Sequence, residues 1–423
     1  MRGLRLSLML VVAGIVATSL VATAQRGAVT GVTVFQGARL ITGTGGPVID
    51  NATIVVNGGR FVQVGPAASV QVPAGATRVD LSGKTVMPAI IDAHTHLSGT
   101  REMLVDDLQR RAYYGIGAAI SLGQDAGDLP YQVRAEVIPN AARFFTAGRG
   151  ITMPEPGRNT TPYWIKSAEE GRKAVQELAA KKVDIVKVWV DDRNGQYPKL
   201  GPELYGPIIE EAHKHGLRVT AHIFNLDDAK GLMKAGIDAF AHGVRDKDVD
   251  DELLAMFKQR PNVIVVPNLA DRGVKVDMSW LSASIPSGEL QKLQAAATDR
   301  PEAQQTFALQ ARNLARMNKA GVRIAMGTDG NTPWGPHVEM EDMVAAGMTP
   351  AQVLVASTRT AAELIGIKDA GTIETGKSAD FVVLDGNPLD DIKNTRRISS
   401  VYLRGATVDR AALAAKWMGG STK

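Results

Sequence analysis

The sequence lacks cysteine altogether, which excludes disulfide bonds, thiolate metal ligands and cysteine nucleophiles. Any bound metal must therefore be held by histidine, aspartate, glutamate or lysine. An excess of one charge is also lacking, because 48 basic residues stand against 44 acidic ones without a long basic run. We therefore expect no nucleic-acid partner. What is present is ordinary globular composition over 423 residues, 44% of them hydrophobic, which is enough for a large core.

The N-terminus carries an apolar run that is typical of a secretory signal peptide. The run extends from Leu6 to about Val21 after two arginines, and Ala22-Thr23-Ala24 supplies a small-residue cleavage pattern. An uncleaved membrane anchor is the alternative, because the run is borderline in length for a membrane span. We expect cleavage near Ala24 and a secreted or periplasmic protein that does not contact the membrane afterwards.

The two ends of the chain share a β-rich texture. Short β-like runs broken by glycine, proline and asparagine extend from Val29 to about Lys84, and they return from about Thr372. Two such ends around an α/β middle predict that the ends pair into one small β-sandwich. We therefore expect a signal peptide at 1–24, sandwich segments at 25–85 and 370–423, and one large α/β domain at 86–369.

The middle alternates short apolar strands with amphipathic helices such as Ala168–Lys181 and Pro207–His215. The predicted strands begin at Val86, Gly117, Arg143, Asp184, Arg218, Ala239, Val263 and Arg323. Eight strands that alternate with helices are typical of a (β/α)8 TIM barrel. A doubly wound open sheet is the alternative, and the spacing alone does not exclude it.

His94 and His96 are the first candidates for chemistry. They end the apolar run that begins at Val86, and residues two apart on a strand point to the same face. Two imidazoles that converge in this way can hold half of a metal site. Two loop histidines that are close by coincidence are the alternative. His213 and His215 share the spacing but lie at the end of a helix, where they do not share a face, so they are not expected to be ligands.

Further polar residues occur singly at the ends of the later strands. Lys187 lies inside the otherwise apolar run from Asp184 to Val190, where a lysine is costly unless it is paired, modified or coordinated. His222, His242 and Asp329 each follow an apolar strand. Each of them alone could be an ordinary core or loop residue. Together they lie at the carboxyl ends of parallel strands, where barrel active sites are found.

The ordered set His94-x-His96, Lys187, His222, His242 and Asp329 resembles the metal-ligand signature of the amidohydrolase superfamily. The segments Gly376–Leu384 and Asn387–Leu389 also resemble that family's C-terminal β strand and the turn that follows it. The resemblance extends from about Val32 to Val408.

This resemblance implies two divalent metal ions, most often zinc. His94, His96 and Asp329 would bind the first ion, His222 and His242 the second, and Lys187 would bridge them as a carbamate formed with carbon dioxide. A hydroxide shared by the two ions would attack the substrate. Asp329 would move the proton to the leaving amine.

Within the superfamily, the chain is most similar to members that cleave Xaa-Pro dipeptides and N-acyl amino acids. They share the lysine-bearing strand and the Ala241-His242-Gly243 turn. After His222, however, this chain has Ile223-Phe224-Asn225, where those members carry a small residue and then tyrosine or histidine. This departure puts the peptidase substrate class in doubt.

The loops after the strands are expected to bind a small-molecule substrate with an aromatic or apolar part and a carboxylate. Simple packing of the aromatic residues around the barrel rim is the alternative. The candidate substrate residues are Arg149, Tyr163, Trp164, Trp189, Arg193 and Trp334. Asp329, His242 and His337 are the predicted catalytic residues, and His337 either contacts the substrate or lies in a turn.

Three functions follow from these patterns. The first is hydrolysis of a carboxamide bond, and the second is hydrolysis of a lactone, an ester or a phosphotriester at the same centre. The third is a non-catalytic binding barrel, which the complete set of six ligand positions disfavours. A homo-oligomer is also expected.

Overall fold

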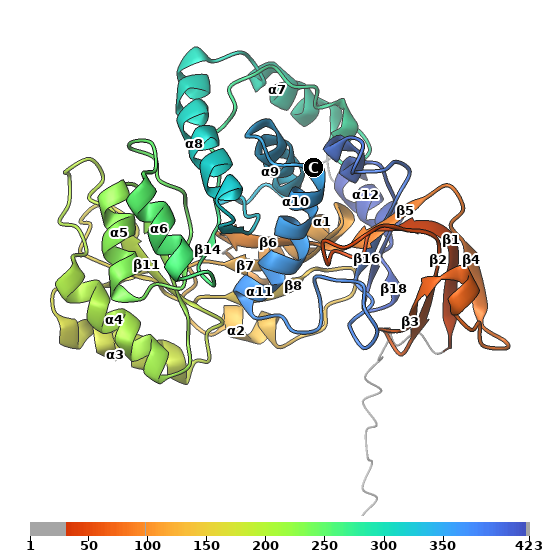
Figure 1. Ribbon diagram of the computed structural model, residues 1–423, viewed down its shortest axis with the longest axis horizontal. Coiled ribbons are helices and arrows are strands. Elements are labelled where there is room, and N and C mark those ends of the chain that lie inside the picture. The colour runs from red at the N-terminus through yellow and green to blue at the C-terminus, as the bar shows by residue number, and fades with distance from the viewer. Residues whose placement is uncertain (1–30, 98, 420–423) are drawn as a thin grey trace, which may run out of the picture.

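The computed structural model describes residues 31–97 and 99–419 (Figure 1). The predicted signal peptide lies outside this range and stays a prediction, as does the division into domains. No helix in the described range is long and apolar enough to cross a bilayer.

Strands from both chain ends form one eight-stranded sheet, which lies to the right in Figure 1. Its order is β18-β17-β16-β5-β1-β2-β3, with β4 paired to β1. The central pairings join β5 to β1 in parallel and to β16 in antiparallel orientation. The strands are β1 (Thr33–Leu40), β2 (Ile49–Asn57), β3 (Arg60–Pro66), β4 (Thr77–Asp80), β5 (Thr85–Pro88), β16 (Phe381–Leu384), β17 (Ile398–Leu403) and β18 (Ala406–Thr407).

The α/β part contains two sheets whose neighbouring strands all run parallel. One has the order β6-β7-β8, and the other has the order β10-β9-β11-β12-β13-β14-β15. The strands are β6 (Ile90–Thr95), β7 (Ile116–Ser121), β8 (Arg143–Thr146), β9 (Ile151–Thr152), β10 (Tyr163–Trp164), β11 (Val186–Val190), β12 (Val219–Ile223), β13 (Ala239–Phe240), β14 (Ile264–Val265) and β15 (Arg323–Ile324).

Backbone hydrogen bonds connect both edge strands of the three-stranded sheet, β6 and β8, to the seven-stranded sheet. Ala93 N on β6 donates to Met326 O just after β15 over 3.1 Å, and Asp184 N before β11 donates to Thr146 O on β8 over 3.0 Å. The carboxyl ends of β6 and β15 therefore lie side by side. The mixed α/β class is confirmed, and seven of the eight predicted strands begin within two residues of the expected position. The first prediction is corrected, because Val86 belongs to β5 of the mixed sheet and the first parallel strand, β6, begins only at Ile90.

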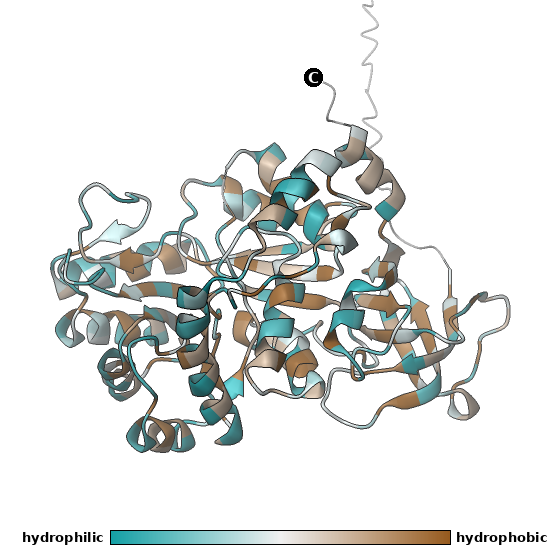
Figure 2. Ribbon diagram, turned by 90° about the horizontal axis from the view of Figure 1, so that it is seen from above, coloured by the Kyte–Doolittle hydropathy of each residue, from teal (hydrophilic) through white to brown (hydrophobic). Residues whose placement is uncertain are grey.

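Helices surround the parallel strands, and in Figure 2 they combine hydrophobic and hydrophilic residues while the strands are mainly hydrophobic. The helices are α1 (Arg101–Tyr113), α2 (Leu129–Arg134), α3 (Ala168–Ala180), α4 (Pro202–Lys214), α5 (Leu226–Ala235), α6 (Asp251–Gln259), α7 (Ser287–Ala296), α8 (Pro301–Lys319), α9 (Gly335–Ala345), α10 (Pro350–Val355), α11 (Ala361–Ile365) and α12 (Arg410–Gly419). Short helical turns are η1 (Ala67–Ser69), η2 (Ser279–Leu281), η3 (Ala356–Thr360, a π-helical turn) and η4 (Ile392–Arg396).

Helix α4 begins earlier than its sequence suggests. Proline favours the first turn of a helix, so Pro207 was expected near the start. The helix in fact begins with Pro202, and Pro207 lies inside it. Helix α3 agrees with its prediction, because Ser167 and Glu170 form a capping box that fixes its start.

Candidate metal centre

Strand β6 and the residue that follows it supply two of the predicted ligands, His94 and His96. All six residues from Ile90 to Thr95 are buried, as expected for a parallel strand covered on both faces. The His94 side chain is fully buried, whereas that of His96 is 18% exposed at the strand end. The two rings are 5.2 Å apart between centroids, so the pair converges as its spacing predicts.

The orientation of the His94 ring is fixed by two oxygen atoms. Its Nδ1 lies 3.0 Å from the Ala241 carbonyl and 2.9 Å from Asn268 Oδ1, and both oxygens accept a hydrogen bond from an Nδ1–H group. This arrangement places the proton on Nδ1 and leaves the Nε2 lone pair free. Such a contact is typical of a histidine that binds a metal through its other nitrogen.

Asp329 joins both histidines. Its Oδ1 lies 3.1 Å from His94 Nε2 and 2.9 Å from His96 Nε2, and its backbone N donates to the His94 carbonyl over 2.7 Å. The backbone of Asp329 has a left-handed φ of +54°, a value that residues other than glycine rarely adopt outside constrained sites. Burial alone would raise the pKa of Asp329, but His94, His96 and Lys187 hold it below its usual value.

Lys187 lies inside this group on β11 and is completely buried. Its Nζ lies 3.4 Å from His94 Nε2 and 5.3 Å from the ring centroid of Trp189. Burial lowers the pKa of the Lys187 amine to about 7. A neutral amine is the form that can add to carbon dioxide, so the environment suits a carbamate.

His222 and His242 complete the cluster, with their ring centroids 4.4 Å apart. His222 Nε2 lies 2.8 Å from Asp191 Oδ2, which leaves Nδ1 as the nitrogen for a metal. His242 Nδ1 contacts Arg245 Nη2, and its Nε2 lies 3.6 Å from Asp329 Oδ2. Burial lowers the pKa of His222 to about 4 and that of His242 well below its usual value, so both rings are neutral and able to coordinate.

The donor set fits a divalent metal. One ligand atom from each of His94, His242 and Asp329 lies within 4.8 Å of the others. Neutral imidazoles and a carboxylate are the ligands that zinc prefers when cysteine is absent. The structure therefore brings together all six predicted ligand residues, although they come from five separate strands.

A buried ion pair, Asp92–Arg111, lies next to the candidate ligands His94 and Asp329. Asp92 Oδ2 accepts from Arg111 Nη1 over 2.9 Å, and both side chains are fully buried. Asp92 also accepts hydrogen bonds from the backbone N atoms of His94 and Thr328 and from the Thr328 hydroxyl. One carboxylate thus links the His94 strand to the loop that carries Asp329.

Sequence reasoning missed three residues around the centre, namely Asp191, Arg245 and Asn268. Asp191 could have been found, because it directly follows β11 and continues the two-residue alternation of Lys187 and Trp189. Asn268 has a φ of +44° and Arg245 lies beyond a turn, so periodicity carried no signal for either.

Three predicted substrate residues, Arg149 after β8 and Tyr163 and Trp164 on β10, lie in the segment between β8 and α3. Arg149 Nε donates to the Thr161 carbonyl over 2.5 Å, and its guanidinium lies 3.9 Å from the Tyr163 ring centroid. The Tyr163 hydroxyl donates to Glu177 Oε2 over 2.9 Å. Trp164 is partly buried, and its Nε1 has no partner. The Arg149 guanidinium and the Tyr163 hydroxyl, which would be the substrate-binding groups, are therefore engaged in contacts within the protein.

Trp189 and Arg193 lie beside the centre, as predicted. Trp189 is 7% exposed and faces the Lys187 amine. Arg193 Nη1 lies 2.6 Å from Asp191 Oδ2 and 3.4 Å from His222 Nε2, and its Nε donates to Glu155 Oε1 over 3.1 Å. Two carboxylates already neutralise this guanidinium.

The structure does not support the predicted catalytic role of His337 or the substrate role of Trp334. His337 is buried, with Nε2 lying 2.9 Å from the Tyr114 carbonyl and Nδ1 lying 3.0 Å from Thr395 Oγ1. Tyr114 precedes β7, at the amino ends of the strands and away from the ligands. The Trp334 ring packs against Tyr114 as well, with 5.9 Å between centroids. Both side chains stabilise the outer helix layer.

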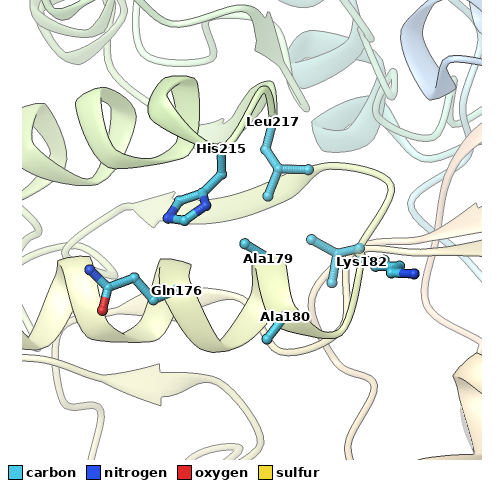
Figure 3. Close-up of a pocket in the computed structure, with 7 residues that line it drawn as sticks. Gln176, Ala179, Ala180, Lys182, His215 and Leu217 are labelled. Atoms are coloured by element: carbon cyan, nitrogen blue, oxygen red, sulfur yellow. The ribbon is translucent and has the colours of Figure 1, made fainter.

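A separate hollow lies between the ends of α3 and α4 (Figure 3). Gln176, Ala179, Lys182, His215 and Leu217 contribute to its wall. These residues precede β11 and β12, so the hollow is at the opposite end of the strands from the metal ligands. His215 contacts Glu211, and His213 contacts Asp238, in agreement with the prediction that neither is a ligand.

Comparison with known proteins agrees with the resemblance to amidohydrolases that the sequence shows. A sequence model of the amidohydrolase family matches residues 85–408. An ochratoxinase from Aspergillus niger is 27% identical over 297 residues, which cover 66% of this chain and 56% of the ochratoxinase. The chain thus spans little more than half of that relative. An imidazolonepropionase from Deinococcus radiodurans is 27% identical over 385 residues, covering 85% of this chain and 92% of the relative.

Solved structures share the architecture. A proposed prolidase from Bifidobacterium longum superposes with a TM-score of 0.74 and 26% sequence identity. The superposition covers 92% of this chain and 99% of the other.

Proposed function

The chain belongs to the amidohydrolase family, and from this premise we propose that it hydrolyses a carboxamide bond of a small molecule at a centre of two zinc ions. The bond is of the peptide or N-acyl amino acid kind. The observation that carries the proposal is the convergence of six side chains at the carboxyl ends of the parallel strands, namely His94, His96, Lys187, His222, His242 and Asp329.

In this proposal His94, His96 and Asp329 would hold one ion, and His222 and His242 would hold the other. Lys187, as a carbamate, would offer both ions an anionic oxygen ligand in place of a buried cation. The ions, when bound, would supply Lewis-acid polarisation of the substrate carbonyl and a water of lowered pKa.

The protein groups perform the positioning and the proton transfer. Asp329 has a lowered pKa and is therefore ionised, so it can accept a proton from the attacking water. It then donates that proton to the nitrogen of the leaving amine, so that one water and one amide yield one carboxylate and one amine. Asn268 and Asp191 hold the rings of His94 and His222 in place during the reaction.

We also propose that the two parallel sheets form one closed (β/α)8 barrel. The hydrogen bonds from Ala93 to Met326 and from Asp184 to Thr146 support this closure. The strands of both chain ends would form the accompanying β domain. We further propose that the protein is secreted or periplasmic and that it forms a homo-oligomer.

The test measures amine release from a panel of N-acyl amino acids and Xaa-Pro dipeptides by the mature, zinc-loaded protein. We expect release that falls by about 10²–10⁴-fold in Asp329→Asn, the contribution of a general acid–base residue. No release from any amide, with two ions bound per chain, would contradict the proposal and favour an ester, lactone or phosphotriester substrate.

The carbamate is tested separately by ¹³C NMR after equilibration with ¹³C-labelled bicarbonate. The expected result is a carbamate signal in the wild type that is absent from Lys187→Arg, because a guanidinium stays protonated and does not add carbon dioxide. A wild-type spectrum without that signal would exclude the modification, whatever the activity.

A further inference from the structure

Arg245 is a cation at the metal centre that the mechanism above does not use. It follows β13 by way of His242, Gly243 and Val244, and its backbone N donates to the Phe224 carbonyl over 2.8 Å. This bond ties the loop after β13 to the loop after β12. The Arg245 guanidinium lies against His242, with Nη2 beside Nδ1. It therefore stands at the carboxyl ends of the strands, among the candidate ligands.

The other guanidinium groups near the centre have carboxylate partners. Arg193 contacts Asp191 and Glu155, and Arg111 contacts Asp92. Arg245 differs, because within residues 31–97 and 99–419 it forms no salt bridge of 4.0 Å or less, although the charges of Asp329, Asp191 and Glu339 act on it from farther away. Its Nε is buried and has no hydrogen-bond partner. A buried, unpaired cation is costly, so the residue is suited to receive an anion that the protein does not supply.

The contact with His242 leads to the same conclusion. A neutral His242 that binds a metal through Nε2 carries its proton on Nδ1. Two donors, the Nδ1–H group and the Arg245 Nη2–H group, would then face each other. The guanidinium hydrogens therefore need another acceptor whenever His242 is a ligand. A planar guanidinium matches the two oxygens of a carboxylate in bidentate geometry.

We propose that Arg245 binds a carboxylate of the substrate and so selects acidic amides over neutral ones. The inference rests on the proposed amide hydrolysis, and it names the group that this site recognises. Arg149 and Arg193 were the arginines among the candidate substrate residues, but their guanidinium groups are engaged within the protein. Arg245 therefore replaces them as the proposed carboxylate-binding arginine.

Three amides with a common phenethylamine skeleton test the proposal with the zinc-loaded enzyme. N-acetylphenylalanine carries its carboxylate on the amine half, N-succinylphenethylamine carries it on the acyl half, and N-acetylphenethylamine has none. We expect one acid to exceed the neutral amide by about tenfold to a hundredfold in kcat/KM, the range of a charge-assisted hydrogen-bond pair. Which acid is preferred identifies the half of the substrate that faces Arg245.

Arg245→Met should reduce that preference to about one, and Arg245→Lys should retain part of it. Lys247→Met is the matched control. Lys247 belongs to the same loop, but its side chain is 51% exposed and already paired with Asp227, so this variant should keep the full preference. Metal content is measured for each variant, so that loss of an ion is not mistaken for loss of recognition.

Direct binding provides a readout that does not depend on turnover. Calorimetric titration with 3-phenylpropanoate should give a dissociation constant about tenfold weaker for Arg245→Met than for the wild type and for Lys247→Met. Equal binding by all three proteins, or an acid preference that persists in Arg245→Met, would overturn the role of Arg245. Carboxylate binding without hydrolysis of any amide would instead refute the proposed reaction and retain the anion site.

Discussion

His222 Nε2 lies 2.8 Å from Asp191 Oδ2, and this contact determines which nitrogen of the ring faces the centre. Burial alone would raise the pKa of Asp191, but hydrogen bonds from His222 and Arg193 hold it below its usual value, so the residue is an anion. A carboxylate behind a metal-binding histidine increases the basicity of the ligand and fixes its orientation.

Asp191→Asn should therefore weaken the second metal site by about 10–100-fold while leaving the first occupied. Elemental analysis after dialysis against graded concentrations of chelator measures the metal content. Asp192→Asn is the control, because the Asp192 carboxylate only accepts a hydrogen bond from Gly195 N in an exposed turn. Identical retention of metal by the two variants would contradict the assigned role.

The buried pair Asp92–Arg111 should show strong energetic coupling. Asp92→Ala leaves Arg111 buried with one partner fewer and deprives Thr328 and His94 of an acceptor, at a cost of about 3–5 kcal/mol in the free energy of unfolding. Adding Arg111→Met should recover part of this loss, because the uncompensated charge is removed. Urea denaturation of both single variants and the double variant measures the coupling, and strictly additive effects would disprove it.

Asp125 should make stability depend on pH. Burial raises the pKa of Asp125 to about 7, although Ser121 and Thr146 donate hydrogen bonds to it. Between about pH 4 and pH 7 the folded state therefore binds more protons than the unfolded state, and stability falls as pH rises through this window. Asp125→Asn should show a shallower decline. The measurement is the difference in unfolding free energy between variant and wild type across that range, and a constant difference would contradict the prediction.

Gly150 should not tolerate a side chain. A Cβ atom built there would overlap the ring of Trp189, which packs beside the Lys187 amine. Gly150→Ala should therefore destabilise the protein by about 1–3 kcal/mol and change its tryptophan fluorescence. Gly206→Ala is the matched control in α4, because nothing lies within 4 Å of its added atom, and it should stabilise the helix by up to about 1 kcal/mol. Unchanged fluorescence in Gly150→Ala would contradict the packing argument.

The candidate ligands could be predicted from the sequence because they lie on or directly after short apolar strands, whose two-residue periodicity is visible in the sequence. His94 and His96 share a face through the two-residue repeat, and Lys187 was conspicuous as a charge within an apolar run. His337 was misassigned because it lies close to Asp329 along the chain. Helix α9 begins at Gly335, between the two residues, and directs the His337 ring toward Tyr114 instead. Arg245 and Asn268 escaped detection because loop conformations and three-dimensional contacts, unlike strand periodicity, leave no regular spacing in the sequence.

The sheet shared by both chain ends has a consequence for synthesis of the protein. Arg60 donates a hydrogen bond to the Gly376 carbonyl, 316 positions later, and β5 pairs with β16 near the end of the chain. While the ribosome is still translating the middle of the chain, the edge of β5 that awaits β16 has no partner. An open strand edge of this kind is prone to pair with other chains. The edge of β5 therefore stays open until β16 has been synthesised, and a chain that terminates before Phe381 lacks the strand that completes this sheet.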